Sequence, residues 1–252
     1  MKPVKADPWS ELRRLTPARI ALGRAGSSLP TREVLAFGLA HARARDAVHH
    51  ALDVARLLAD LKSAGWEATC VQSAATDRQT YLTRPDLGRR LAHGTPLDGN
   101  APIAVALEDG LSAIAVQTHA VPLLQELRKM NKARWADVRV VIALQGRVAL
   151  GDEIGERLGA RLAVVLIGER PGLSSPDSLG VYLTYAPRVG RTDAERNCIS
   201  NIRPSGLGYV DAAKRIDWLA GAALVRGLTG VQLKDDSGDR PEPVQRLQVP
   251  DV

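Results

Sequence analysis

The sequence predicts an α/β protein with a Rossmann-like, mostly parallel sheet and an N-terminal helical region. Three observations indicate this class. Short apolar runs alternate with helical segments beyond residue 102, glycine-bearing turns follow these runs, and helical periodicity dominates the first third of the chain. With 252 residues the chain is long enough to bury a substantial core around such a sheet.

The best domain boundary is the stretch from His93 to Asn100, where five of eight residues favour turns. We therefore expect an N-terminal helical region at residues 1–97 and a Rossmann-like domain at residues 98–236. Residues 237–252 contain several prolines and no apolar periodicity, so we expect a disordered tail there.

Within the N-terminal region, apolar residues from Thr31 to Ser63 recur at helical spacing, which predicts one long helix, kinked near Gly38. A short strand is expected at Thr69–Gln72 and a short helix at Leu87–Leu91. The apolar stripe of the long helix has two interpretations, contact with a partner subunit or packing on the chain's own α/β domain. The sequence leaves both open.

Beyond the boundary, strands and helices are expected to alternate. Such alternation is typical of right-handed βαβ units and hence of a largely parallel sheet. The predicted strands are Ile103–Leu107, Val138–Leu144, Leu162–Ile167 and Val181–Tyr185, and the predicted helices are Leu111–Lys129, Leu150–Leu158 and Val210–Arg226.

Polar, glycine-bearing turns follow the first three of these strands. Asp109 follows the first strand, Arg147 the second and Glu169 the third. The carboxyl ends of parallel strands meet at one edge of a sheet, where open α/β proteins bind their ligands. We therefore predict a glycine-lined binding cleft that carries these three side chains.

No known catalytic or metal-binding pattern accompanies this cleft. The chain has no GxSxG nucleophile elbow and no GxGxxG dinucleotide fingerprint, and its histidines lack the HExxH spacing of a zinc protease. Its two cysteines, Cys70 and Cys198, are far apart and form no metal-binding motif. The residues alone favour a binding module with no catalytic residues and no metal site of its own.

Charge and hydropathy restrict the partners. The net charge is +6, but the arginines are spread along helices and aromatic residues make up only 4%, so a nucleic-acid partner is not expected. An acidic subunit or a phosphate-bearing ligand would satisfy this charge. No apolar run is long enough for a membrane span or a signal peptide, which favours a reducing cytoplasm.

Several longer segments closely resemble the small (light) subunit of ethanolamine ammonia-lyase. The densest are GERPGLSSPDSLG at Gly168–Gly180, YLTY at Tyr182–Tyr185 and RTDAERNCISNI at Arg191–Ile202. Further matching segments are Leu22–Gly26, Leu29–Thr31, Asp86–Arg90, Asp109–Ala113 and Gly146–Asp152, so the resemblance runs from about Thr16 to Asp235. A match of this length is far more specific than any short motif.

The resemblance implies an adenosylcobalamin-dependent lyase that converts ethanolamine to acetaldehyde and ammonia by a radical mechanism. A large barrel subunit would hold the substrate, and this chain would cover the other side of the cobalt-containing cofactor in a hetero-oligomer. Such a chain is not expected to be active alone. Family members are cytoplasmic or packaged in bacterial microcompartments, and the sequence leaves packaging, substrate scope and the number of subunit pairs open.

Three positions match the cofactor contacts of that family: Val148, Glu169 and Cys198. Arg147, beside Val148, is an auxiliary candidate for an amide or phosphate of the cofactor. The chain lacks the Asp-x-His-x-x-Gly motif with which other corrinoid proteins displace the cofactor's own base, and His119 lies outside such a pattern. We therefore expect the dimethylbenzimidazole base to stay on cobalt.

Three alternatives do not depend on the resemblance. The chain would be a cofactor-binding or regulatory Rossmann-like module of another multi-subunit enzyme, a stand-alone enzyme with a nucleotide cofactor, or a structural or regulatory interaction protein that binds a partner but no cobalamin. The missing GxGxxG fingerprint counts against the second.

Overall fold

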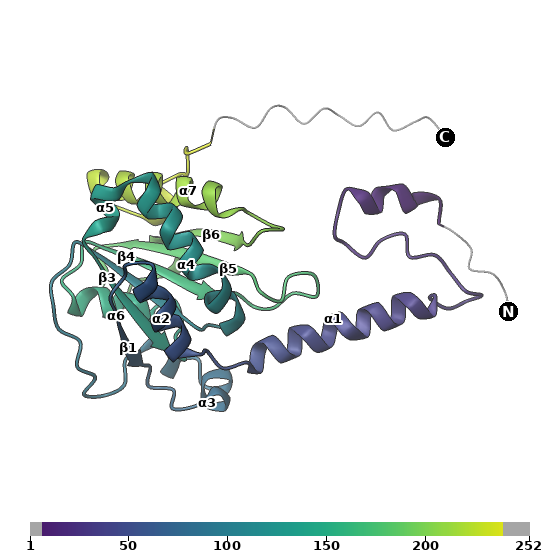
Figure 1. Ribbon diagram of the computed structural model, residues 1–252, viewed down its shortest axis with the longest axis horizontal. Coiled ribbons are helices and arrows are strands. Elements are labelled where there is room, and N and C mark those ends of the chain that lie inside the picture. The colour runs from purple at the N-terminus through teal and green to yellow at the C-terminus, as the bar shows by residue number, and fades with distance from the viewer. Residues whose placement is uncertain (1–6, 239–252) are drawn as a thin grey trace.

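A computed structural model describes residues 7–238 (Figure 1). Its α-helices are α1 (Thr31–His49), α2 (Val54–Ser63), α3 (Arg78–Thr83), α4 (Ala113–Met130), α5 (Lys132–Ala136), α6 (Leu150–Arg157) and α7 (Tyr209–Arg226). Its strands are β1 (Ala68–Gln72), β2 (Ile103–Glu108), β3 (Val138–Leu144), β4 (Leu162–Gly168), β5 (Leu179–Tyr185) and β6 (Arg196–Ile202). Short 3₁₀ helices occupy Pro8–Arg14, Leu87–Arg89, Asp193–Glu195 and Gly230–Gln232. No helix among residues 7–238 has the length and hydropathy needed to cross a membrane.

The strands form one sheet in the order β1-β3-β2-β4-β5-β6. The pairs β1–β3, β3–β2 and β2–β4 are parallel, whereas β4–β5 and β5–β6 are antiparallel. The predicted α/β class with a mostly parallel sheet is confirmed. Its two central strands, β2 and β4, are buried along their whole length, as expected for strands covered on both faces.

The prediction that Val181–Tyr185 continues the parallel pattern was wrong. Only residues 169–178 connect β4 to β5, without a helix, and a parallel crossover needs a dozen or more residues. The chain therefore turns back, and β5 runs antiparallel to β4. Strand β6 was not predicted because RNCISNI is mostly polar, as is usual for a strand at the edge of a sheet.

Helices cover the two faces of the sheet unequally. Helices α2, α4 and α7 pack on one face, where the larger core includes Leu57, Leu124 and the fully buried Trp135. Helix α6 packs on β2 and β4 on the opposite face and forms a smaller core around Leu150 and Ile154. The second face is thus left open beyond α6, over β5 and β6.

The predicted long helix at Thr31–Ser63 is two helices. His50 has an extended backbone, with ψ 129°, and the side chain of Asp53 caps the new helix α2 by accepting from the Arg56 amide at 3.0 Å. The break lies at residues 50–53, whereas Gly38 lies within α1 without interrupting it.

These two helices have different surroundings. Leu57 and Leu61 of α2 are fully buried in the core, so α2 packs on the chain's own α/β domain. Helix α1 projects away from the sheet (Figure 1), and its side chains Leu35 and Leu39 are 69% and 54% exposed. The apolar surface of α1 is therefore available to another molecule.

Strand β1 and helix α2 come before the predicted boundary between residues 97 and 98, yet β1 pairs with β3 and α2 shares the large core. The two predicted regions therefore share one sheet. The boundary between residues 97 and 98 stays a prediction. The predicted tail at residues 237–252 lies almost entirely outside the described residues.

Replacing Leu61 with Ala should lower the free energy of unfolding by about 2–5 kcal/mol, because it leaves a cavity in the core under α2. The matched control, Leu35→Ala, removes the same atoms from the exposed side of α1 and should change stability by less than about 0.5 kcal/mol. Urea denaturation of the purified chain measures both. Equal losses in the two variants would contradict the different packing of α1 and α2.

Candidate functional site

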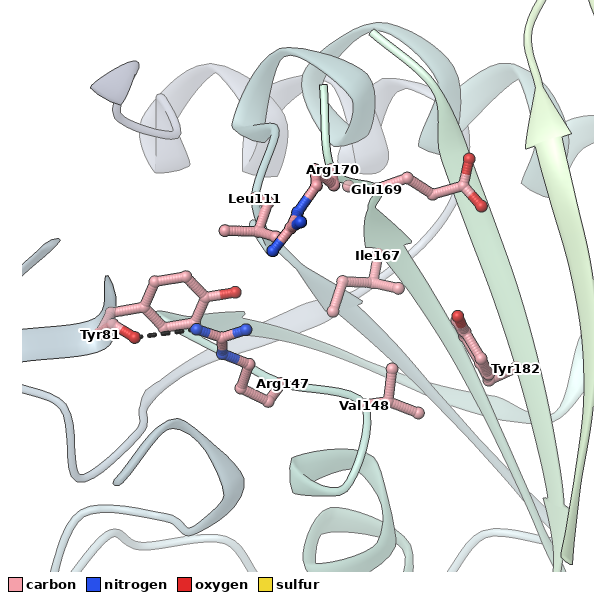
Figure 2. Close-up of a pocket in the computed structure, with 9 residues that line it drawn as sticks. Tyr81, Leu111, Arg147, Val148, Ile167, Glu169, Arg170 and Tyr182 are labelled. Carbon is pink, nitrogen blue, oxygen red and sulfur yellow. Dashed lines mark hydrogen bonds between the residues drawn. The ribbon is translucent and has the colours of Figure 1, made fainter. Parts of the chain in front are cut away.

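The carboxyl ends of β2, β3 and β4 meet at one edge of the sheet. The chain passes from β2 to its neighbour β3 and then returns to the other side of β2 to form β4. A reversal of this kind opens a crevice between the two strands on either side of it, and open α/β proteins bind ligands there. A cavity of about 400 Å³ lies at this point (Figure 2), and it is lined by Tyr81, Leu111, Arg147, Val148, Ile167, Gly168, Glu169, Arg170 and Tyr182.

Two glycines allow the loops after β2 and β4 to touch. Gly110 has φ 56°, and a Cβ atom there would lie 2.3 Å from the carbonyl oxygen of Gly168. A Cβ atom at Gly168 would lie 2.0 Å from the carbonyl oxygen of Ser112. The close approach lets the Leu111 amide donate to the Gly168 carbonyl at 2.9 Å, which fixes the back of the cavity.

Arg147 is anchored from two directions. Its backbone amide donates to the Gly88 carbonyl at 2.8 Å, and its Nη2 donates to the Tyr81 carbonyl at 3.0 Å. Its guanidinium lies 4.2 Å from the centre of the Tyr81 ring, and that of Arg78 lies 4.7 Å from it. Tyr81 is thus held between two cations, and the neighbouring Val148 lines the cavity beside it.

Glu169 connects the loop after β4 to β6. Its carboxylate accepts hydrogen bonds from the hydroxyl of Ser178, from the hydroxyl of Ser200 at 2.5 Å and from the amide of Asn201 at 3.2 Å. Two carboxylate oxygens offer about four acceptor positions, so these bonds leave capacity for a ligand. Figure 2 shows the carboxylate directed away from Arg147 and Tyr81.

Cys198 lies on β6 directly opposite Tyr182 of β5, outside the cavity lining but next to it. Both side chains are on the open face of the sheet. Burial raises the pKa of the Cys198 thiol above its ordinary value, and the charge of Glu169 adds to this. The sulfur is therefore a neutral contact surface.

The expected place of Asp109 in the cleft was wrong. Asp109 is 3% exposed and lies beneath the cavity, where it accepts from the Gly146 amide at 3.1 Å and is 3.9 Å from Arg78. Burial raises the pKa of its carboxyl group. Its role is to support the loop after β3.

A second buried carboxyl group, Glu108, lies at the end of β2 beneath Gly146 and Gly151. It is fully buried, and neither of its oxygens has a hydrogen-bond partner among residues 7–238. Burial, with the nearby charges of Asp109 and Asp152, raises the pKa of Glu108 well above its ordinary value. A neutral Glu108 costs less free energy in this position than a carboxylate would.

Beside it, Asp152 of α6 and Arg196 of β6 form a buried ion pair at 2.5 Å. Arg196 also donates to the Thr184 hydroxyl at 3.1 Å. The pair ties α6 to the antiparallel edge of the sheet.

His119 lies on the far side of the sheet from the cavity. It is in α4, is 1% exposed, and its ring nitrogens lie 2.7 Å from the Tyr209 hydroxyl and 3.3 Å from Asp177. It does not line the cavity.

Tyr81, Leu111, Ile167 and Tyr182 also line the cavity and were not predicted as site residues, whereas Arg170 lines it directly after Glu169 at the carboxyl end of β4. Ile167, Arg170 and Tyr182 adjoin or lie within the segments that carried the family resemblance, so their proximity to Glu169 could have been inferred. Tyr81 comes from α3, before the predicted boundary, and no sequence pattern indicated that it packs against Arg147.

The fold and the cavity define an α/β protein with a cavity that is open on one side and is shaped by the loops after three parallel strands. Comparison with known proteins gives the family. The family model described as "Ethanolamine ammonia-lyase light chain (EutC)" matches residues 6–234. This chain belongs to that family of ethanolamine ammonia-lyase small subunits.

Curated relatives agree along nearly the whole chain. The ethanolamine ammonia-lyase small subunit of Azotobacter vinelandii is 54% identical over 249 residues, covering 93% of this chain and 91% of its own length. Those of Xanthomonas campestris pv. campestris and Ralstonia nicotianae are 56% and 55% identical, and each alignment covers 90% of the relative.

Replacing Glu108 with Gln should remove a pH-dependent loss of stability. A carboxyl group whose pKa is raised by folding stabilises the protein below its unfolded pKa of about 4.3, and this contribution is lost as pH rises toward the folded pKa. The wild type should therefore lose stability relative to Glu108→Gln, by at most about 1.4 kcal/mol per pH unit, as pH rises above 4.3.

Urea denaturation of both proteins between pH 5 and pH 8 measures this difference. Glu67→Gln, on the exposed segment before β1, controls for removal of a surface carboxylate. A constant difference between wild type and Glu108→Gln across this range would show that Glu108 is not held neutral by folding.

Proposed function

We propose that this chain is the cofactor-holding half of an adenosylcobalamin-dependent ethanolamine ammonia-lyase and acts only with the large subunit. The observation that carries the proposal is the joint position of Val148, Glu169 and Cys198. Val148 and Glu169 line one cavity, and Cys198 is paired with Tyr182 of the same cavity. These are the three positions that the family resemblance selects.

The residues present fit a corrinoid. Leu111, Val148 and Ile167 offer apolar surface to a flat macrocycle, and Tyr182 and Cys198 extend this surface over the open face of the sheet. A polar group at the rim, Glu169, suits the amide side chains of a corrin. A cavity of about 400 Å³ is of the size that takes drug-sized ligands, so a corrinoid would project from it toward a second subunit.

If bound here, adenosylcobalamin would supply the radical chemistry for the conversion of ethanolamine. The residues of this chain bind and orient the cofactor. Glu169 fixes the loop after β4 against β6 and keeps acceptor capacity for a corrin amide, while Val148 and Cys198 exclude water from the face that they cover. No residue of this chain is assigned to the chemistry, and the substrate site is assigned to the large subunit.

Helix α1 is proposed to bind the large subunit. Val34, Leu35, Phe37 and Leu39 are about half or more exposed and lie around much of the helix circumference. A helix that is apolar on several sides is normally buried. The C-terminal end of α1 is joined to the site, because Arg78 donates to the Val48 carbonyl at 2.6 Å and to the Gly110 carbonyl at 2.7 Å.

The test is ammonia release from ethanolamine in the presence of adenosylcobalamin. The candidate large subunit is assayed alone and after co-expression with this chain. Activity is expected only for the pair. A pair that binds cobalamin but does not consume ethanolamine would overturn the substrate assignment, and the absence of both complex and cobalamin binding would overturn the proposal as a whole.

Variants at Cys198 and Glu169 should raise the concentration of adenosylcobalamin that the two-subunit complex requires for activity. Loss of one neutral contact at Cys198→Ala should raise it roughly 2- to 10-fold, and Glu169→Ala, which also loosens the loop after β4, should raise it further. Turnover at saturating cofactor should stay near the wild-type value. Titration of activity with adenosylcobalamin measures both quantities.

Cys70→Ala is the matched control, because Cys70 is likewise an exposed free cysteine but lies on β1 at the opposite edge of the sheet. The two-subunit complex with Cys198→Ala could instead keep its cofactor requirement and lose turnover. That result would assign Cys198 to the chemistry and contradict the binding role.

A further inference from the structure

The cavity lining carries more positive than negative side chains. Its lining contains Arg147, Arg170 and Glu169. The Glu169 carboxylate is occupied by Ser178, Ser200 and Asn201 and points away from the two arginines in Figure 2. Within residues 7–238 neither arginine forms an ion pair with a carboxylate, whereas the nearby Arg78 lies 3.9 Å from Asp109. The cavity therefore presents two positive charges without a counterion from the described chain.

Arg147 is preorganised for a ligand. Its Nη2 bond to the Tyr81 carbonyl and its position over the Tyr81 ring fix the plane of the guanidinium. Its Nε is buried and has no hydrogen-bond partner in the described part of the chain. A guanidinium that is already ordered loses little further side-chain entropy when it binds an anion.

Arg170 and the Tyr81 hydroxyl face the same region. Arg170 is exposed, follows β4 directly, and its guanidinium extends toward Tyr81 and Arg147 (Figure 2). No hydrogen bond joins its side chain to any other residue between 7 and 238. Burial raises the pKa of Tyr81, so its hydroxyl stays protonated and can donate. Three donor groups from three different segments thus converge.

We infer that Arg147, Arg170 and the Tyr81 hydroxyl form a phosphate-binding subsite. Planar guanidinium groups bind phosphate oxygens in a bidentate manner, and a hydroxyl donor completes a set suited to a tetrahedral anion. The inference rests on the proposed function, in which the phosphate is the phosphodiester that joins the corrin ring to the nucleotide base of cobalamin. A free nucleoside monophosphate offers the same chemistry from another source.

Three corrinoids that differ in this group test the subsite: adenosylcobinamide, which has no phosphate, adenosylcobinamide phosphate, and adenosylcobalamin. Their affinities for the two-subunit complex are measured by absorbance titration. Arg147→Gln and Arg170→Gln should each weaken binding of the two phosphate-bearing ligands roughly 10- to 100-fold, the usual range for one charge-assisted hydrogen bond. Adenosylcobinamide should bind each variant as tightly as it binds wild type.

Arg215→Gln is the control, because Arg215 is exposed on α7, on the other face of the sheet. Arg170 is exposed and its side chain forms no hydrogen bond or ion pair within residues 7–238, so Arg170→Gln remains a valid test if Arg147→Gln fails to fold. Equal losses for all three corrinoids, or no loss for any, would overturn the subsite.

Adenosine monophosphate separates this inference from the proposed function. If the wild-type complex binds adenosine monophosphate in an Arg170-dependent manner but binds no corrinoid, the subsite is retained and the cobalamin role falls. If it binds all three corrinoids with equal affinity in wild type and variants, the cobalamin role is retained and the subsite is overturned.

Discussion

The contact between the loops that follow β2 and β4 is the constraint on which the site depends. Gly110 and Gly168 approach so closely that a Cβ atom on either would overlap a backbone carbonyl oxygen. This contact sets where Leu111, Glu169 and Arg170 leave the sheet. Because β3 follows β2 and the chain then returns to form β4, the same edge also receives Arg147 and Val148.

The site is open on one side for a structural reason. After β4 the chain turns back and forms two antiparallel strands, and helix α6 packs mainly on β2 and β4 on that face. Tyr182 and Cys198 are consequently left on an exposed surface that continues from the cavity. Helix α1 is also uncovered and is joined to the site through Arg78. Both features agree with a chain that is completed by a partner subunit.

The sequence predicted the parallel strands well, because β2 and β4 are buried along their whole length, β3 is buried over Val140–Ala143, and all three are mostly apolar. The sequence did not predict the features that depend on tertiary contacts or on loop length. The return of the chain at β5 depends on the length of the loop after β4, and the end of α1 depends on the cap at Asp53. Arg147 and Glu169 were found from their positions after strands, but Tyr81 was missed because its contact with Arg147 joins residues far apart in the chain.

A cryo-electron microscopy structure of the two-subunit complex with adenosylcobalamin tests the cofactor-holding role most directly. Corrinoid density is expected against Val148, Glu169 and Cys198, with α1 buried on the large subunit. Density for the cofactor that lies away from the carboxyl ends of β2, β3 and β4, or wholly within the large subunit, would contradict this role.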